Sequence, residues 1–316
     1  MMKKIDVFID KIKSAKSIAI FGHKNPDGDC LCSALALMKI IELNFGKSST
    51  VIYDGNIPLF LEEVPLRKSA VFHRHLPENS KFDLCIIVDY GTRKHLAFSE
   101  NFVKDADYII EFDHHYNEDL VGNLCFDDVT KAATSQIIYD VVRKAKLKTD
   151  KDIIDLLTIA LITDTGNFKF VRNSKVFEDA AELVKAGADI NALTNLLDNS
   201  DKKTVIVESE AVANSEFLMK NKLVIATIKK EDYKKLDGRG ELVLSILGKI
   251  HGVEYVVLLK EQKENQIGVS LRSKKTPINH IAESFGGGGH LCAAGAVITD
   301  SLENVHDKIV EAFKGM

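Results

Sequence analysis

The sequence predicts an α/β protein built from two domains: a parallel sheet with helices on both faces, followed by a smaller α/β domain. In the first half, short and almost continuously apolar segments alternate with helical patterns, which is typical of strands buried on both faces of a parallel sheet. After Lys222 the order changes to a strand, a helix and a pair of strands. The length of 316 residues also suits two domains, each with its own hydrophobic core.

Four segments of the first half have the composition of strands: residues 17–22, 49–54, 82–90 and 107–115. The third segment, FDLCIIVDY, is almost entirely apolar, so we expect it to be buried on both faces. Apolar residues at helical spacing predict an amphipathic helix at residues 1–17. Further helices are expected at residues 31–45, 132–146, 152–162 and 175–186.

The second half has a different pattern. We expect the first domain to cover residues 1–188, a polar linker to cover 189–216 with a helix from about 204 to 219, and the second domain to cover 217–316. The second domain should contain a strand (222–228), a helix (238–250), a hairpin (254–273), a helix (278–285), a glycine loop (286–290) and a strand (293–300).

Composition excludes several classes of protein. With 45% hydrophobic and 28% charged residues, the chain is neither disordered nor a collagen-like or coiled-coil rod. A net charge of −4 argues against coating long nucleic acid by charge alone, although short nucleotides are compatible with it. Five cysteines without CxxC spacing predict neither disulfides nor a zinc framework. No apolar run reaches the roughly 18 residues of a membrane span, so we expect a cytoplasmic protein.

Acidic residues and histidines follow the predicted strands at the points where the strands end. The carboxyl ends of parallel strands meet at one edge of a sheet, where ligands bind. We therefore expect these side chains to form one site, together with an aspartate that ends an apolar helical segment. They are His23, Asp27 and Asp29 after the first strand, Asp89 after the third, Asp113, His114 and His115 after the fourth, and Asp164.

Taken singly, each motif has a plain structural explanation, because Asp-Gly forms turns, aspartates cap helices and a histidine pair can be structural. Together, however, gathered carboxylates repel one another unless cations neutralise them. Carboxylate and imidazole ligands without thiolates favour Mn²⁺, with Mg²⁺, Fe²⁺ or Co²⁺ as alternatives. We expect Cys30 and Cys32 to pack the start of a helix rather than bind metal. Two ions bridged by Asp89 would suit phosphoester hydrolysis.

A run of glycines near the C-terminus is the second informative feature. Gly286, Gly287, Gly288 and Gly289 precede His290, and successive glycine N–H groups can form an anion-binding nest, although a loop that ends a helix explains the run equally well. Arg272 lies at a predicted strand end and suits bidentate phosphate binding. No Walker loop and no complete GxGxxG occurs, which argues against nucleotide triphosphate or dinucleotide redox chemistry.

The motifs HKNPDGD, VDYG, DHH and TDTGNF resemble, in the same order, the four motifs of the DHH phosphoesterase superfamily. GGGGHLCAAGA resembles the glycine-rich signature of the associated DHHA1 domain, so the resemblance spans nearly the whole chain. By architecture the chain is most similar to the NrnA-like oligoribonuclease and pAp phosphatase group. This resemblance implies a Mn²⁺-dependent enzyme that hydrolyses short oligonucleotides (nanoRNA) to mononucleotides. Several members also dephosphorylate 3′-phosphoadenosine 5′-phosphate (pAp), and some act on cyclic di-AMP or pApA.

The resemblance also implies residue roles. One metal would be held by His23, Asp27 and Asp89, and the other by Asp29, Asp89, His114 and Asp164. His115 would contact the scissile phosphate and assist protonation of the leaving oxygen, and Asp113 would orient a histidine. Substrate binding would fall to Arg272, Gly286, Gly287, Gly288, Gly289 and His290. The chain departs from the family at Glu118, where an asparagine is common.

The expected function is therefore hydrolysis of short oligonucleotides, and of pAp to AMP, by two-metal activation of water. Three alternatives stay open: a cyclic di-AMP phosphodiesterase, a manganese inorganic pyrophosphatase, and a nucleotide sensor without catalysis. The pyrophosphatases share HxNPDxD and DHH with the first domain only, and a sensor would be expected to lack a ligand. The sequence shows no clear interface for a homodimer, which also stays open.

Overall fold

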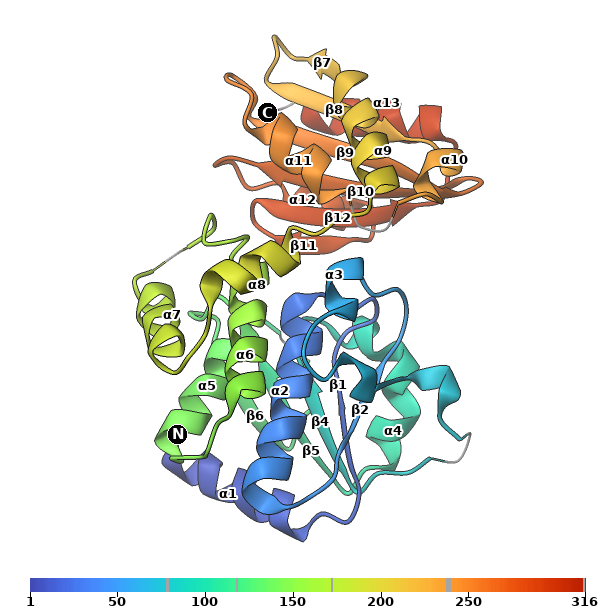
Figure 1. Cartoon of the computed structure of the whole chain (residues 1–316). Helices are drawn as coiled ribbons and strands as arrows, with labels where there is room; N and C mark the ends of the chain where they lie inside the picture. The colour runs from blue at the N-terminus through green and yellow to red at the C-terminus, as the bar shows by residue number, and fades with distance from the viewer. Residues whose placement is uncertain (78–79, 118, 172, 237–239, 315) are drawn as a thin grey trace. The chain divides into compact units, whose positions relative to one another are not determined.

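The computed structural model describes residues 1–316 except 78–79, 118, 172, 237–239 and 315. The chain divides into two compact units, Met1–Asn199 and Ser200–Met316. The division falls within the segment 189–216, where we expected a linker. That segment contains two helices, α8 (Ile190–Leu197) in the first unit and α9 (Lys202–Ala213) in the second. Both units are coloured by residue number in Figure 1.

The first unit contains a six-stranded sheet, sheet A, in which every neighbouring pair of strands is parallel. This confirms the predicted parallel sheet. The strand order reverses between β1 and β4, and such a reversal is where open α/β sheets bind ligands. Two of the strands, β3 and β6, have only three and four residues and were not predicted. In spatial order the strands are β3 (Ala70–Phe72), β2 (Thr50–Tyr53), β1 (Ile18–Phe21), β4 (Leu84–Val88), β5 (Tyr108–Asp113) and β6 (Leu124–Asp127).

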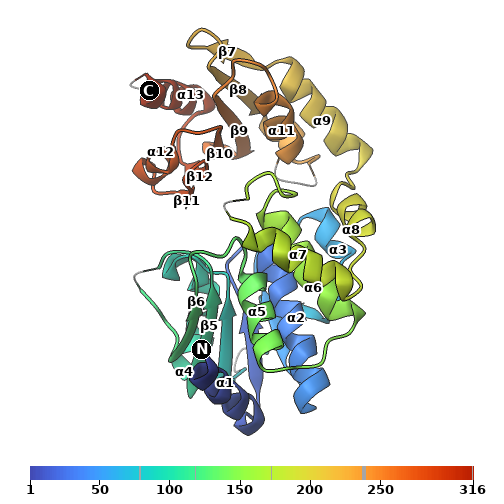
Figure 2. The same cartoon turned by 90° about the vertical axis from the view of Figure 1, so that its left-hand side faces the viewer.

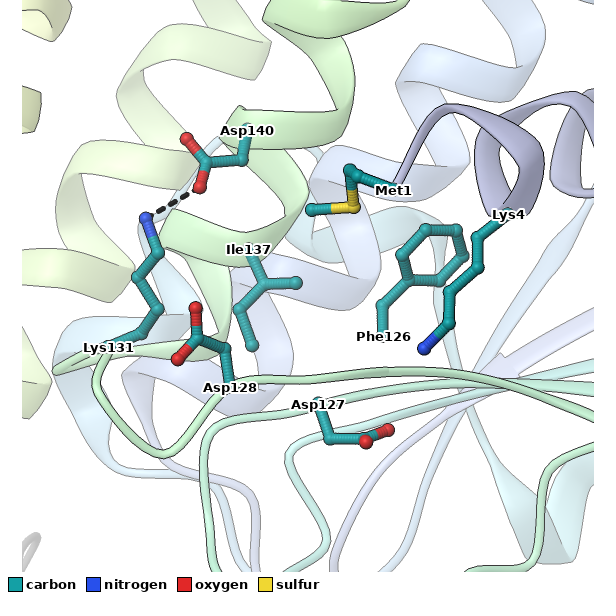
Figure 3. Close-up of a pocket in the computed structure, with 8 residues that line it drawn as sticks. All are labelled: Met1, Lys4, Phe126, Asp127, Asp128, Lys131, Ile137 and Asp140. Carbon is teal, nitrogen blue, oxygen red and sulfur yellow. Dashed lines mark ion pairs between the residues drawn. The ribbon is translucent and has the colours of Figure 1, made fainter.

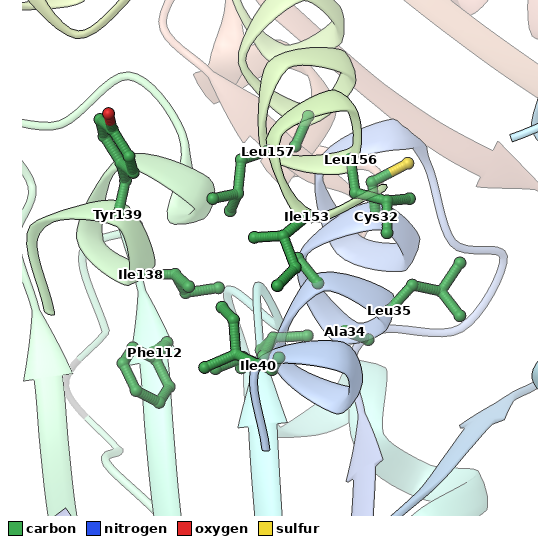
Figure 4. Packing of buried hydrophobic residues seen from close by; sticks show 14 of the residues in the cluster. Cys32, Ala34, Leu35, Ile40, Phe112, Ile138, Tyr139, Ile153, Leu156 and Leu157 are labelled. Atoms are coloured by element: carbon green, nitrogen blue, oxygen red, sulfur yellow. The ribbon is translucent and has the colours of Figure 1, made fainter. Parts of the chain in front are cut away.

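Helices cover both faces of sheet A, as predicted. Alternate residues of β1 face opposite sides: Ile18 and Ile20 join the main core, whereas Ala19 and Phe21 pack toward a smaller cluster. The main core lies under α1 (Met2–Ser14), α2 (Gly28–Phe45), α5 (Thr134–Lys144) and α6 (Lys151–Asp164). Figure 2 shows α2, α5 and α6 side by side, and Figure 4 shows their apolar side chains meeting. The smaller cluster lies under η3 (Arg93–Ser99) and α4 (Glu100–Asp105).

Short elements complete the first unit. After β2 come α3 (Leu59–Glu62), η1 (Arg67–Ser69) and η2 (His73–His75), and after α6 comes α7 (Lys175–Lys185). The predicted helix ranges agree with α1, α2, α5, α6 and α7 to within a few residues. Among the residues that the structure describes, we find no helix with the length and apolar character needed to cross a bilayer.

The second unit contains a six-stranded mixed sheet, sheet B, in which only β8 and β9 are parallel. Helices α12 (Asn279–Ser284) and α13 (Leu302–Phe313) contribute to the core on one face, and α9 and α11 (Glu241–Gly248) to the core on the other. Helix α10 (Lys230–Tyr233) follows β8. The strands, in spatial order, are β11 (Gly288–His290), β12 (Ala293–Ile298), β10 (Gln266–Ser273), β9 (Tyr255–Lys263), β8 (Leu223–Ile228) and β7 (Glu216–Leu218).

Candidate active site

The segment between β1 and α2 carries the first group of polar side chains. Asp27 is the N-cap of α2, where its Oδ1 accepts a hydrogen bond from the Cys30 N–H at 3.1 Å. The His23 Nε2 lies 3.5 Å from the Asp27 Oδ2. The predicted motif therefore has two roles at once, because the aspartate that starts the helix also faces the histidine that follows the strand.

Asp89 lies at the centre of the candidate site. It follows β4 with φ of 49°, a left-handed conformation that few residues other than glycine adopt, and its side chain is 3% exposed. Its Oδ2 lies 3.8 Å from the His23 Nε2. Its Oδ1 lies 3.5 Å from the His114 Nε2 and 3.4 Å from the His115 Nδ1. The two oxygens of one buried carboxylate thus face two different groups of side chains.

Asp113, the last residue of β5, holds the loop after β4 and the ring of His115. Its Oδ2 accepts hydrogen bonds from the backbone N–H groups of Tyr90 (3.1 Å) and Gly91 (2.8 Å). Its Oδ1 lies 2.8 Å from the His115 Nδ1 and accepts the His115 N–H at 2.9 Å. These contacts hold the His115 imidazole against the Asp113 carboxylate.

Asp164 reaches the site from the end of α6, where its Oδ2 lies 3.2 Å from the His114 Nε2. Gly28 permits this approach, because a Cβ atom at Gly28 would lie 2.3 Å from the Thr163 Oγ1. Any larger residue at the start of α2 would push the end of α6, and Asp164 with it, away from the site.

Asp29 is 1% exposed and connects two helices. Its carboxylate accepts hydrogen bonds from the Ser33 Oγ at 3.0 Å and from the N–H groups of Thr134 (2.5 Å) and Ser135 (3.1 Å). It therefore binds the N-terminus of α5, which favours a negative charge. The Thr134 Oγ1 also donates to the Asp89 Oδ1 at 3.3 Å. Sequence reasoning missed Thr134, although the Thr-Ser pair before an apolar helix was a detectable signal.

The loop before α5 supports His114. The His114 Nδ1 lies 3.4 Å from the Lys131 carbonyl oxygen, and the Lys131 Nζ forms an ion pair with the Asp140 Oδ2 at 2.6 Å. Figure 3 shows this pair at the edge of a cavity of about 70 Å³ that Met1 and Phe126 also line. Asp179, fully buried, lies 3.8 Å from the Lys131 Nζ and pairs with Arg143 at 3.2 Å. A buried ionic network thus fixes the backbone that contacts His114.

Burial and mutual repulsion raise the pKa values of two carboxyl groups at the site. Burial raises the pKa of Asp29, and the charges of Asp89 and Asp164 raise it further. Burial is also the largest cause that raises the pKa of Asp164 to about 7, with Asp89 and Asp27 adding to it. Because its pKa lies at about 7, the Asp164 carboxyl group is partly protonated at neutral pH in the structure as described.

The pKa values of two histidines are raised as well, but by neighbouring carboxylates and against the effect of burial. Burial alone would lower the pKa of His115, but hydrogen bonds to Asp113 and Asp89 raise it to about 11. Burial likewise opposes the charged form of His114, but the nearby carboxylate of Asp89 and the charge of Asp164 raise its pKa to about 9. In Asp89, these interactions outweigh burial and hold the pKa well below its ordinary value. Both imidazoles are therefore protonated on both ring nitrogens, and positively charged, at neutral pH in the structure as described.

The donor set fits a divalent cation. Ligand atoms of Asp29, Asp89 and His114, all buried, lie within 4.8 Å of one another, which is the spacing of atoms around one ion. The same spacing holds for His23, Cys30 and Asp89. Burial raises the pKa of the Cys30 thiol to about 11, so this sulfur is a poor ligand beside oxygen and imidazole donors. Buried carboxylates with raised pKa values are the groups that a cation would stabilise in their charged form.

The second unit brings part of the predicted substrate-binding set together. In sheet B, His290 of β11 pairs with Ala293 of β12, which pairs with Arg272 of β10. Directly opposed residues of antiparallel strands point to the same face, so Arg272 and His290 share one face with a small alanine between them. Glu118, the departure from the family pattern, lies outside the described residues.

The glycine run differs from the expected loop. Gly288 and Gly289 belong to strand β11 and pair with β12. The Gly286 N–H donates to the Glu283 carbonyl oxygen and the Gly287 N–H to the Ala282 carbonyl oxygen, both at 2.9 Å. These bonds form a Schellman cap at the end of α12, with Gly286 at φ of 76°. Of the two alternatives left open by the sequence, the loop that ends a helix therefore describes Gly286 and Gly287, because their N–H groups bond to carbonyl oxygens of α12.

The first unit has the features of a class of α/β enzymes in which carboxylates and imidazoles at the carboxyl edge of a parallel sheet bind metal ions. Comparison with family models gives the family. Residues 17–161 match the DHH family, N-terminal domain, and residues 219–315 match the DHHA1 domain. The chain belongs to the DHH/DHHA1 phosphoesterases, which confirms the resemblance seen in the motifs, and it is a hydrolytic phosphoesterase.

Individual relatives are similar over almost their whole length. The chain is 29% identical to the "Probable bifunctional oligoribonuclease and PAP phosphatase NrnA" of Streptococcus mutans, covering 96% of each chain. It is 25% identical to the Bacillus subtilis protein called "Bifunctional oligoribonuclease and PAP phosphatase NrnA", covering 89% of each. A crystal structure of an exopolyphosphatase-related protein from Bacteroides fragilis has the same fold, with a TM-score of 0.87 at 23% identity and coverage of 99% and 96%.

Proposed function

We propose that the protein is a Mn²⁺-dependent phosphodiesterase that cleaves short oligonucleotides, such as nanoRNA and pApA, to mononucleotides and also converts pAp to AMP. The observation that carries the proposal is the position of Asp89, whose two oxygens face separate groups of imidazole and carboxylate ligands. The names of the relatives support the substrate class, since several are called oligoribonucleases and PAP phosphatases.

The ligand assignment follows the two sides of Asp89. His23 and Asp27 lie on the side of the Asp89 Oδ2 and would hold one ion. His114 lies on the side of the Oδ1 and contacts Asp164, and its ligand atom clusters with that of Asp29, so these three residues would hold the other ion. Mn²⁺ suits this mixture of oxygen and nitrogen donors, and Mg²⁺ or Co²⁺ are the alternatives. Two bound divalent ions would polarise a phosphoryl oxygen and lower the pKa of a water molecule.

His115 would contact the phosphate and donate a proton, and Asp113 would position His115. His115 is held by Asp113 through Nδ1 and is protonated at neutral pH because its pKa is raised to about 11. We assign to His115 contact with the scissile phosphate and delivery of a proton from Nε2 to the leaving oxygen as the phosphorus–oxygen bond breaks. Asp113 acts only through His115, because its own oxygens accept bonds from Tyr90, Gly91 and His115.

In the second unit, Arg272 and His290 share one face of sheet B and would bind the nucleotide. The glycines contribute differently from the expected nest. A Cβ atom at Gly289 would lie 2.6 Å from the Ala293 carbonyl oxygen, so this residue must be glycine for β11 to pair with β12 and present His290. We assign Gly286 and Gly287 to the support of that strand rather than to direct phosphate contact.

The test is hydrolysis of labelled pApA by the full-length protein, with Mn²⁺ present or removed by chelation and AMP release followed by chromatography. We expect release with Mn²⁺ and none after chelation. A panel of pAp and RNA of two to about ten nucleotides would define the length limit. If protein with confirmed bound metal releases no mononucleotide from pApA, the short-oligonucleotide assignment is wrong.

Hydrolysis of cyclic di-AMP is the second candidate. The chain is 24% identical to the "Cyclic-di-AMP phosphodiesterase GdpP" of Geobacillus thermodenitrificans over 96% of its own length but only 49% of that protein. Similarity to half of a longer protein favours it less than end-to-end similarity to shorter relatives. Comparing initial rates on pApA and cyclic di-AMP at equal concentration separates the two candidates. Pyrophosphate in the same panel tests the pyrophosphatase alternative.

A further inference from the structure

A cavity of about 330 Å³ lies directly beside the DHH motif in the first unit. This volume is at the lower end of the range for small-molecule sites. Among the residues that line it are His115, Tyr116, Leu120, Asp127, Asp128 and Val129. His115 thus contributes both to the candidate active site and to the wall of this cavity. None of the roles assigned above uses Tyr116, Leu120, Val129 or the two aspartates.

The ends of two neighbouring strands hold the cavity in place. Asp113 of β5 and Asp127 of β6 are register partners, and the Asp128 N–H donates to the Asp113 carbonyl oxygen at 3.1 Å. The cavity therefore lies at the same carboxyl edge of sheet A as the candidate active site. A substrate whose phosphate contacts His115 would bring its adjoining nucleoside to the mouth of this cavity.

Three large apolar side chains of the cavity face solvent. Tyr116 is 77% exposed, Leu120 is 49% exposed and Val129 is 53% exposed. An exposed aromatic ring next to aliphatic side chains is a surface on which a nucleobase can stack, because every base has an apolar face.

The charges in the cavity select a base rather than a second phosphate. Asp127 and Asp128 line it, and two carboxylates repel a phosphate group. Carboxylate oxygens instead accept hydrogen bonds from the N–H and amino groups of bases. The Asp128 side chain is held by the Thr130 N–H at 3.0 Å and the Thr130 Oγ1 at 2.6 Å. One of the two acceptors is thus pre-oriented by its own loop.

We propose that this cavity binds one nucleobase of the substrate, with Tyr116 as the stacking surface and Asp127 and Asp128 as acceptors for its N–H groups. The inference rests on the proposed function, because it requires a nucleotide whose phosphate lies at His115. It adds a base subsite within the first unit itself, next to the bond that is cleaved.

The kinetic test uses the full-length protein and Tyr116→Ala on pApA. We expect KM to rise about ten-fold, with kcat little changed. This increase corresponds to the lower end of the free-energy range that stacking of one base contributes. Tyr116→Phe keeps the ring and should retain the KM of the wild type. Phe177→Ala is the matched control, since Phe177 is an aromatic 55% exposed on α7, outside this cavity. An unchanged KM in Tyr116→Ala would overturn the proposal.

Two analogues of pApA, each lacking one base, locate the effect. For the analogue that lacks the bound base, the wild type should already have the raised KM, and Tyr116→Ala should raise it no further. If Tyr116→Ala raises KM equally for pApA and for both analogues, the residue acts on the fold or the phosphate, and the base subsite is wrong.

A binding measurement separates this inference from the proposed function. Calorimetric titration with AMP and with ribose 5-phosphate requires no turnover. We expect the wild type to bind AMP about ten-fold more tightly than ribose 5-phosphate, and Tyr116→Ala to bind the two equally. If the wild type does not discriminate, the subsite is wrong even when pApA is hydrolysed. If it discriminates through Tyr116 but releases no AMP from pApA, the subsite stands and the assigned reaction fails.

Discussion

Asp83 at the amino edge of sheet A and two aspartates near the carboxyl edge, Asp29 and Asp164, have pKa values shifted in opposite directions. At the amino edge, Asp83 precedes β4 and accepts hydrogen bonds from the N–H groups of Lys16 and Ser17, both at 2.7 Å, and from the Ser17 Oγ at 3.0 Å. Partial burial would raise the pKa of Asp83, but these bonds lower it below its ordinary value. At the carboxyl edge, burial raises the pKa of Asp29 and Asp164, and neighbouring carboxylates raise it further.

The difference separates a structural role from a functional one. The hydrogen bonds from Lys16 and Ser17 stabilise the charged form of Asp83 and connect the start of β1 to the start of β4. The carboxylates of the other edge lie close together despite their repulsion. Such unfavourable electrostatics is typical of functional sites. Substitutions at the amino edge should therefore change stability, and those at the carboxyl edge should change activity.

The largest effect is expected for Asp89→Asn. Because a bound ion stabilises the transition state by several kcal/mol, kcat/KM on pApA should fall by about 10³-fold or more. The midpoint of thermal unfolding without metal should stay close to that of the wild type, since asparagine also tolerates positive φ. Circular dichroism and steady-state kinetics measure both. Near wild-type turnover in this variant would refute the central role of Asp89.

Addition of metal should stabilise the wild type by relieving repulsion at the carboxyl edge. At about 100 times its Kd, each bound Mn²⁺ should add about 2.7 kcal/mol to the free energy of unfolding, seen as a higher unfolding midpoint. Asp89→Asn should show little of this gain at the same concentration. A wild type that unfolds at the same temperature with Mn²⁺ and with chelator would argue that the carboxyl edge binds no cation.

Thr134→Val tests the hydrogen bond that orients Asp89. Loss of the Thr134 hydroxyl, which donates to the Asp89 Oδ1 at 3.3 Å, should weaken Mn²⁺ binding by about 10- to 100-fold, the usual effect of removing a group that orients a ligand. Mn²⁺ titration followed by electron paramagnetic resonance measures it. Thr134→Ser keeps a hydroxyl and should restore most of the affinity. Equal loss in both variants would point to packing instead.

The smallest effect is expected at the amino edge, in Asp83→Asn. Losing charge-assisted hydrogen bonds should lower the free energy of unfolding by about 1 kcal/mol at pH 7 and leave kcat/KM on pApA unchanged. The Asp83 pKa is lower in the folded state, so its contribution is present above the unfolded value of about 3.9 and is lost as pH falls through the folded value. The difference between wild type and variant should therefore shrink below about pH 4. Chemical unfolding at several pH values measures it, and a constant difference would contradict this account.

Much of the fold was predictable because it depends on local patterns. Long apolar segments such as β4 and β5, and amphipathic helices such as α5 and α7, carry their periodicity in consecutive residues. Strands β3 and β6 were missed, and it is their pairing with β2 and β5 that defines them as strands. The glycine segment was misjudged because pairing of β11 with β12 depends on a neighbouring strand.

The sequence predicted which acidic and histidine side chains gather at the candidate site, but not the hydrogen bonds that hold them in place. Asp89, Asp113 and His114 follow strand ends, and the geometry of a parallel sheet brings such residues together. Thr134 and Asp29 are 105 residues apart, and neither local sequence predicts the hydrogen bond between them. Asp179 is a partial exception, since an aspartate on the apolar face of an amphipathic helix suggests a buried ion pair.

The sequence by itself determined which side chains carry charge, that they follow parallel strands, and that the chain has DHH and DHHA1 motifs. Tertiary structure alone decided that β1 lies beside β4, that Asp89 adopts a positive φ and faces two groups of ligands, and that Gly28 lets Asp164 approach. The reason is physical: charge and periodicity are properties of neighbouring residues, whereas repulsion, burial and hydrogen bonding at the site arise only between segments far apart in the chain.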